Sequence, residues 1–236
     1  MKKQFFLTVL LALCALALCS PQALAQAPTC ARIRTLANCP DTGCGGPGTD
    51  PLLNQMKNRT QDASNPETLT LGDIRQLRQP NRWPVGQERS SLARNEERAV
   101  TVTGFLVRAS ASGKESTNCG LLGAANNDNH LDLLSTANAP RATAVTAEIT
   151  PRVRSQQQGW DLRKLQYLAR QKMFVRVTGW LTLDTQHIER PLVRSTNWEV
   201  HPVTAFEVCT GRVNDCRRGD DWASLEEWEI PRRRRR

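Results

Sequence analysis

Two segments with alternating side chains constrain the fold of this chain more than any other feature. Residues 173–184 read MFVRVTGWLTLD, and residues 100–107 read VTVTGFLV. Side chains of a β-strand point alternately to its two faces, and a glycine within a strand lets it coil sharply or lets another backbone come close. In the longer segment, one face is uniformly apolar and the other is mixed. The pattern predicts two strands that share a buried core.

The body of the chain reads as five strands and one helix. In order, we predict a strand at 99–108, a long loop at 109–127, strands at 128–134 and 143–150, a helix at 155–171, a strand at 173–184, a loop at 188–195 and a strand at 197–208. Within the predicted helix, Trp160, Leu165 and Leu168 fall on one side, and lysines and arginines lie opposite. The predicted fold class is therefore mainly β, with the helix between strands three and four.

This order of elements, with the segments VTVTGFLV, AEITP, VRVTGWLTLD and NWEVHPV, resembles the OB-fold, a small five-stranded barrel, over residues 99–209. Within that class, the chain is most similar to OB-type modules of exported bacterial proteins. The long insertion after the first strand departs from the simplest form of the fold. The resemblance implies that ligands bind the outer face of strands two and three, and the loops that join strands one to two and four to five.

The start of the chain has the layout of a secretory signal. Two lysines precede an apolar run over residues 5–18, and small residues follow at Ala23 and Ala25, as in signals that are removed on export. We therefore predict that residues 1–25 are removed and that the protein is periplasmic or extracellular. A lipid-anchored start at Cys19 is the alternative. No later segment is apolar enough to predict a membrane span.

Six cysteines lie beyond the predicted signal: Cys30, Cys39, Cys44, Cys119, Cys209 and Cys216. An even number of cysteines in an exported chain predicts disulfides, with fifteen pairings open. Because the cysteines gather near the two ends, at least one bridge is expected to tie a terminal arm to the body, and Cys119 is a candidate partner. No pair has the spacing of a zinc site, so zinc on these thiols is not expected.

The barrel is predicted to lie between two extensions. Residues 26–98 form an irregular, disulfide-braced N-terminal arm with a short helix at 70–78, where Thr70 and Asp73 form a capping pair. Residues 210–236 form a C-terminal extension with a short acidic helix near Trp222 and a tail of five arginines. The net charge of +9 falls to about +2 once the two signal lysines and these arginines are set aside, so charge is a weak argument that the body binds nucleic acid.

Strand alternation selects the candidate ligand-binding residues. In strands two and three, Leu131, Leu133 and Ala147 are expected to point inward, which leaves a polar and acidic outer face. This face lacks the aromatic platforms on which single-stranded nucleic acid stacks. With neighbouring charged and aromatic residues included, the candidate ligand-binding residues are His130, Glu148, Arg152, Trp180, Asp184, His187, Arg194 and Trp198.

All three histidines lie close to carboxylates in the sequence, as the pairs Asp128 and His130, Asp184 and His187, and Glu199 and His201. An imidazole beside a carboxylate suits a divalent metal or a general acid–base pair. The spacings match no known zinc motif. The strand ends are expected to bring His130 and His187 to one rim, and His201 is expected elsewhere. The alternative is that these histidines have structural hydrogen-bonding roles and that the tryptophans pack in the core.

The leading hypothesis is an exported OB-type binding module for an anionic or sugar-containing polymer, such as nucleic acid or glycan, or for a partner protein of the envelope. It requires no cofactor, metal or catalytic residue. One alternative is a nuclease-like hydrolase, in which a cation held by Asp128, His130, Asp184 and His187 activates water. A second alternative is a structural envelope protein whose arm and tail contact neighbours.

Overall fold

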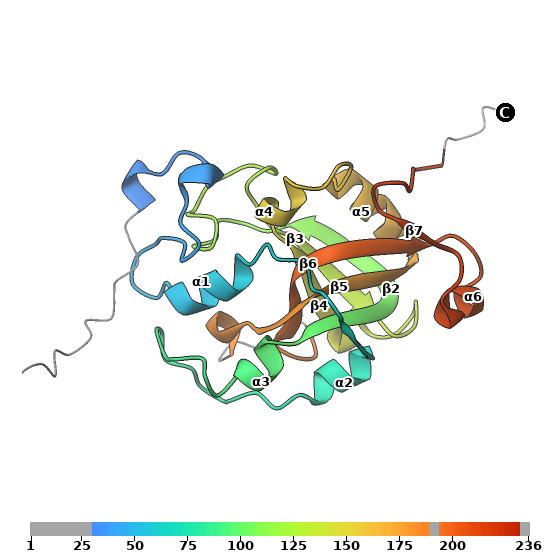
Figure 1. The fold of residues 1–236 in the computed structure, drawn as a ribbon, viewed down its shortest axis with the longest axis horizontal. Coiled ribbons are helices and arrows are strands. Elements are labelled where there is room, and N and C mark those ends of the chain that lie inside the picture. The colour runs from blue at the N-terminus through green and yellow to red at the C-terminus, as the bar shows by residue number, and fades with distance from the viewer. Residues whose placement is uncertain (1–29, 189–193, 232–236) are drawn as a thin grey trace, which may run out of the picture.

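The computed structural model describes residues 30–188 and 194–231 (Figure 1). The predicted signal, the alternative start at Cys19 and the terminal arginines all lie outside these residues. Among the described helices, none has the length and apolar character that crossing a membrane would require.

A closed barrel of five strands forms the centre of the molecule (Figure 1). Its strands are β2 (Ala99–Ala111), β3 (Asn129–Leu134), β4 (Val145–Ile149), β5 (Phe174–Leu183) and β6 (Trp198–Cys209). They pair in the order β2-β3-β4-β6-β5, and the barrel closes because β5 also pairs with β2. The pair of β4 and β6 is parallel and the others are antiparallel. Each predicted strand of the body is present, with ends shifted by a few residues.

Two short strands extend the barrel sheet at its margins. Strand β1 (Glu67–Leu69) pairs in parallel with β2, and β7 (Trp222–Ser224) pairs antiparallel with β6. Strand β1 precedes the five barrel strands in the sequence, so the third and fourth strands of the barrel carry the labels β4 and β5. Helix α5 (Leu162–Arg170) lies between β4 and β5, not between β3 and β4.

Helix α5 is shorter than the predicted helix because its start is fixed by a cap. The side chain of Asp161 accepts a hydrogen bond from the backbone N–H of Lys164, which satisfies a donor that the helix start leaves free. The residues before it form a separate turn, α4 (Pro151–Arg154). Pro151 stands at its first position, where its missing N–H costs nothing.

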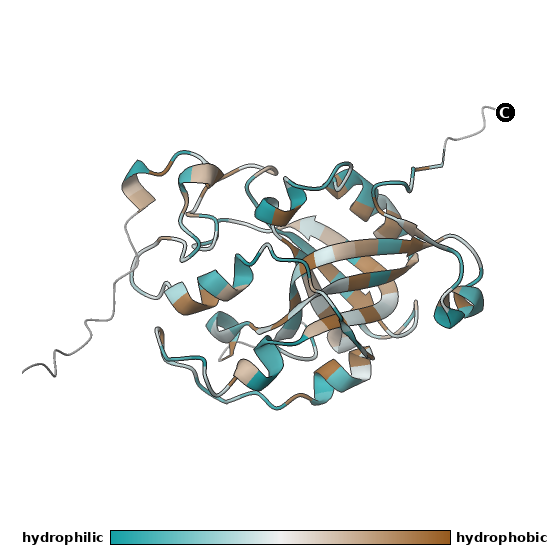
Figure 2. Ribbon diagram, in the orientation of Figure 1, coloured by the Kyte–Doolittle hydropathy of each residue, from teal (hydrophilic) through white to brown (hydrophobic). Residues whose placement is uncertain are grey.

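The core lies inside the barrel, on the face that alternation predicts. In β5, Val175, Val177, Leu181 and Leu183 are all fully buried, and burying such a side chain stabilises the fold by about 1.5–3 kcal/mol. Figure 2 shows the resulting alternation of apolar and polar residues along the strands. A Cβ on Gly179 would lie 2.2 Å from the carbonyl oxygen of Pro202. The close backbone approach that the sequence predicts is therefore confirmed at this glycine.

The N-terminal arm is more ordered than predicted. It contains α1 (Pro51–Lys57), α2 (Leu71–Gln76) and α3 (Ala93–Glu96). Helix α2 has the predicted capping box between Thr70 and Asp73. Helix α1 was not predicted; Asp50 caps it by accepting from two backbone N–H groups, and Pro51 stands at its first position. The described residues also contain short 3-10 turns at Cys30–Arg32, Leu36–Asn38, Arg141–Thr143 and Thr185–His187.

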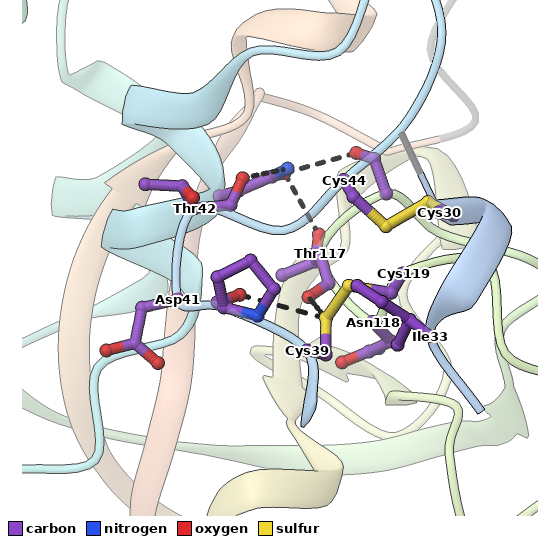
Figure 3. Close-up of a disulfide and its surroundings, with 12 residues drawn as sticks. Cys30, Ile33, Cys39, Asp41, Thr42, Cys44, Thr117, Asn118 and Cys119 are labelled. Atoms are coloured by element: carbon purple, nitrogen blue, oxygen red, sulfur yellow. Dashed lines mark hydrogen bonds between the residues drawn. A yellow bond between two sulfur atoms is a disulfide. The ribbon is translucent and has the colours of Figure 1, made fainter. Parts of the chain in front are cut away.

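Three disulfides brace the arms. They join Cys30 to Cys44, Cys39 to Cys119, and Cys209 to Cys216. The first two lie close together, where the arm meets the loop after β2 (Figure 3). The Cys39–Cys119 bridge confirms that a terminal arm is tied to the insertion in the barrel. The bridges are consistent with an oxidising compartment.

The predicted acidic helix near Trp222 is wrong. A helix, α6 (Val213–Arg218), forms earlier, and residues 222–224 form β7 instead. Pairing with β6 gives this backbone its hydrogen bonds, and the Trp222 ring packs 5.8 Å from that of Phe174. Contact with the rest of the fold therefore overrides the helical spacing of the apolar residues.

Candidate functional site

A charged cavity of about 1230 Å³ opens on the outer face of the barrel. Its floor is formed by residues of β2, β3 and β4, its walls by the loops at 47–50 and 112–117 and by Lys57 of α1, and its rim by Trp83, Val85, the turn at 185–187 and Arg194. The N-terminal arm contributes residues 47–50 and Lys57 to this cavity, so arm and barrel form it together.

Five of the eight predicted ligand-binding residues line this cavity: His130, Glu148, Asp184, His187 and Arg194. They come from β3, β4, the end of β5 and the segment before β6, so distant parts of the chain converge. Strand alternation places the first two on the floor. Closure of the barrel brings the other three to the rim.

The other three predicted residues hold the arm or the core instead of lining the cavity. Arg152 donates hydrogen bonds to the side chain of Asn58 and to the carbonyl of Cys39. The Trp180 indole donates to the carbonyl of Gln61. Trp198 is fully buried, and its indole donates to the carbonyl of Arg78. These contacts correspond to the packing alternative for the tryptophans.

A network of charged side chains lines the cavity and continues beneath it. Glu199 is fully buried on β6, where it alternates with core residues such as Val200. The Nζ atom of Lys57 lies 3.4 Å from Glu199 Oε1 and 3.7 Å from Asp184 Oδ1. The guanidinium of Arg194 donates to both carboxylates, at 2.7 Å to Asp184 and 2.8 Å to Glu199. The two cations thus bind the same two carboxylates.

Glu148 lies between two histidines. Its Oε2 atom is 3.3 Å from Nε2 of His130 and 3.1 Å from Nδ1 of His201. His130 Nε2 is also 3.4 Å from Glu115 Oε1. His201 Nδ1 is 3.1 Å from Glu199 Oε1, and its Nε2 is 3.3 Å from Asp128 Oδ2.

These contacts correct two sequence-based expectations. Asp128 contacts His201, not His130, and His201 belongs to the same network as His130. The reason is the strand order, because β4 lies between β3 and β6 and Glu148 therefore faces a neighbour on each side. The pair of Asp184 and His187 does form, at 2.5 Å.

Burial and neighbouring charges shift the pKa values of this network. Burial alone would raise the pKa of Asp184, but Lys57, His187 and Arg194 outweigh it and hold that pKa well below its usual range. The Glu148 charge is the main cause that raises the pKa of His130 to about 11. Burial acts against the charge of Lys57, yet Asp184 and Glu199 raise its pKa well above the usual value.

The network contains more acids than permanent bases. Its carboxylates belong to Glu115, Asp128, Glu148, Asp184 and Glu199, and its permanent cations to Lys57 and Arg194. An uncompensated charge in a buried site is costly. The remaining negative charge therefore has to be balanced by protons on the histidines or by a bound cation.

The sequence does not predict two residues of this network, Lys57 and Glu115. Lys57 lies at the end of α1, and the Asp-Pro start of that helix is the only local signal. Glu115 lies in the long loop after β2, which has no periodicity to orient it. Its position depends on the Cys39–Cys119 bridge and on Asn118, which donates to Asp128 at 2.7 Å.

The arrangement can bind polar ligands, hold a cation, or transfer protons through histidines. Comparison with known proteins gave no matching family model, no matching curated protein and no matching solved structure. The function is therefore argued from the cavity itself.

Proposed function

We propose that this protein is an exported OB-type binding module whose cavity holds a short stretch of an anionic, hydroxyl-rich polymer, most simply an acidic glycan. The position of the cavity is the observation that carries the proposal. It opens on the outer face of β3 and β4, where the resemblance to the OB-fold implies a ligand.

The charges that line the cavity suit a ligand with hydroxyl groups. The lining has as many carboxylates as lysines and arginines, with two histidines in addition. A hydroxyl group both donates and accepts hydrogen bonds, whereas a carboxylate only accepts and a guanidinium only donates. A lining with both kinds of side chain therefore matches a sugar ring.

Two arginines offer a place for the anionic group. Arg108 and Arg141 lie on either side of Asp132, with side chains 43% and 51% exposed. Arg141 Nε donates to Asp132 at 2.7 Å. A guanidinium has five N–H donors, and two of them can bind a carboxylate or sulfate together. Both arginines line the cavity and are partly exposed, so N–H donors remain for an anionic group there.

The aromatic residues favour a glycan over single-stranded nucleic acid. Proteins that bind single-stranded nucleic acid stack successive bases on several aromatic rings. Among the described residues that line the cavity, Trp83 is the one aromatic side chain.

Calorimetric titration with oligosaccharides tests the proposal. Polyuronate fragments are expected to bind saturably, and uncharged glucan fragments, single-stranded DNA and lipid vesicles more weakly. The variant R141A should lose about tenfold in affinity, since a hydrogen bond to a charged group is worth about 1.5–3 kcal/mol. R163A removes an exposed arginine of α5 outside the cavity and should bind like the original protein. Saturable binding to none of these polymers, or an equal loss in R163A, would refute the proposal.

A metal-dependent hydrolase is the second candidate, favoured by one observation, the histidine and carboxylates on the cavity floor. The four ligands that the sequence suggested do not converge. Asp184 is bound by Lys57 and Arg194, and Asp128 by His201. A hydrolase would need a different set of ligands, and its test is turnover of phosphodiester or ester substrates with added metal.

A further inference from the structure

We propose that Glu115, His130 and Glu148 form a binding site for one divalent cation of the zinc class on the floor of the cavity. The three residues come from the loop after β2, from β3 and from β4. Their ligand atoms all lie within 4.8 Å of one another. This site is independent of the glycan proposal, because it needs no polymer to form.

The distances between the ligand atoms fit a shared cation. His130 Nε2 lies 3.3 Å from Glu148 Oε2 and 3.4 Å from Glu115 Oε1. Zinc bonds to nitrogen and oxygen of about 2.0–2.2 Å in a tetrahedron place neighbouring ligand atoms about 3.3–3.6 Å apart. A cation fits between the three side chains with little movement. All three residues line the cavity.

The contacts of the His130 ring nitrogen point to the same place. His130 Nε2 is shielded from solvent, and its contacts with Glu148 and Glu115, at 3.3 and 3.4 Å, do not have hydrogen-bond geometry. Behind it, across Glu148, His201 Nε2 lies 3.3 Å from Asp128 Oδ2, and both of these side chains are only 1% exposed. Buried polar atoms are normally satisfied. A divalent cation between the three side chains would take the place of the proton on His130, replace these long contacts with short bonds and reduce the excess negative charge of the network.

Two sets of residues could hold a cation, and the set of Glu115, His130 and Glu148 is the more accessible of the two. Asp128, Glu148 and His201 also converge, but all three are buried, and neither Asp128 nor His201 lines the cavity. We assign the inner pair a positioning role. His201 Nδ1 lies 3.1 Å from Glu148 Oε2, and a second group that orients a ligating carboxylate is a regular feature of metal sites.

The mixture of ligands selects the class of cation. One imidazole with carboxylates suits zinc and its first-row neighbours, whereas calcium and magnesium prefer oxygen ligands alone. Zinc and cobalt are therefore expected to bind. Calcium and magnesium should not compete at comparable concentrations.

Calorimetry on the intact protein, stripped of metal with a chelator, tests the site. Titration with ZnCl₂ should show one saturable equivalent, and Co²⁺ should give a visible absorption band that Zn²⁺ abolishes. The variants H130Q and E115Q change side chains that are 31% and 25% exposed, so folding should survive; circular dichroism checks this. Both should lower zinc affinity at least tenfold. H187Q is the matched control, because His187 lines the same cavity outside the proposed set.

Three results would overturn the proposal: no stoichiometric zinc binding to the original protein, full binding in H130Q, or an equal loss in H187Q. None of them bears on glycan binding, which the R141A titration measures separately.

Discussion

At the scale of single residues, Gly179 has the strongest steric requirement in the barrel. An alanine Cβ there would lie 2.2 Å from the carbonyl oxygen of Pro202 and 2.9 Å from a side-chain carbon of Val200. Since the nearest atom is backbone, it cannot rotate away. We expect G179A to lower the free energy of unfolding by about 1–3 kcal/mol, as overpacked cores do.

Urea denaturation measures this change, and Gly46 provides the control. A Cβ on Gly46 meets nothing within 4 Å, so G46A should alter stability by no more than about 0.5 kcal/mol, as substitutions away from special features usually do. Equal stability of the two variants would contradict the close packing of β5 on β6.

At the scale of elements, the sequence predicts what local periodicity controls and misses what distant contacts control. The strands of the barrel follow from alternation, and the capping box of α2 follows from Thr70 and Asp73. At Trp222 the local spacing predicts a helix, but pairing with β6, which is distant in the sequence, makes this segment a strand. The candidate site divides in the same way: alternation places His130 and Glu148 on the outer face, whereas Lys57 is placed by packing of the arm.

Removing single disulfides measures how much the link between the N-terminal arm and the barrel contributes to stability. The Cys39–Cys119 bridge closes a sequence separation of 80 residues, and Cys209–Cys216 closes one of 7. Cross-links stabilise by restricting the unfolded chain, by about 4.5 kcal/mol for the longer loop and about 2.4 kcal/mol for the shorter. The double variant C39S/C119S should therefore be destabilised about twice as much as C209S/C216S.

Thermal and urea unfolding of the two double variants provide the comparison. C39S/C119S should also loosen the loop that holds Glu115, and so weaken zinc binding, whereas C209S/C216S lies away from the cavity and should leave it unchanged. If C209S/C216S loses more stability than C39S/C119S, the bridge to Cys119 does not anchor the arm.

At the scale of the whole molecule, the buried network links stability to pH. The pKa of Asp184 is lowered in the folded protein because Lys57, His187 and Arg194 outweigh the effect of burial. An unfolded aspartate has a pKa of about 3.9. A group whose folded pKa is depressed stabilises the protein fully above the unfolded value, and this contribution is lost as the pH falls toward the folded pKa.

The metal-free protein should therefore lose stability as the pH falls below about 4, and part of that loss should come from Asp184 alone. The variant D184N leaves Lys57 and Arg194 with one charge fewer, so it should be less stable than the original protein at pH 7. The difference should shrink steadily in more acidic buffers, because protonation of Asp184 in the unfolded chain then favours unfolding of the original protein. Urea unfolding at a series of pH values measures it, with D220N, at an exposed carboxylate after α6, as the control that should follow the original protein throughout. A difference between D184N and the original protein that stayed constant down to pH 2 would mean that Asp184 is not held by these cations, and the charged network would then need a different electrostatic account.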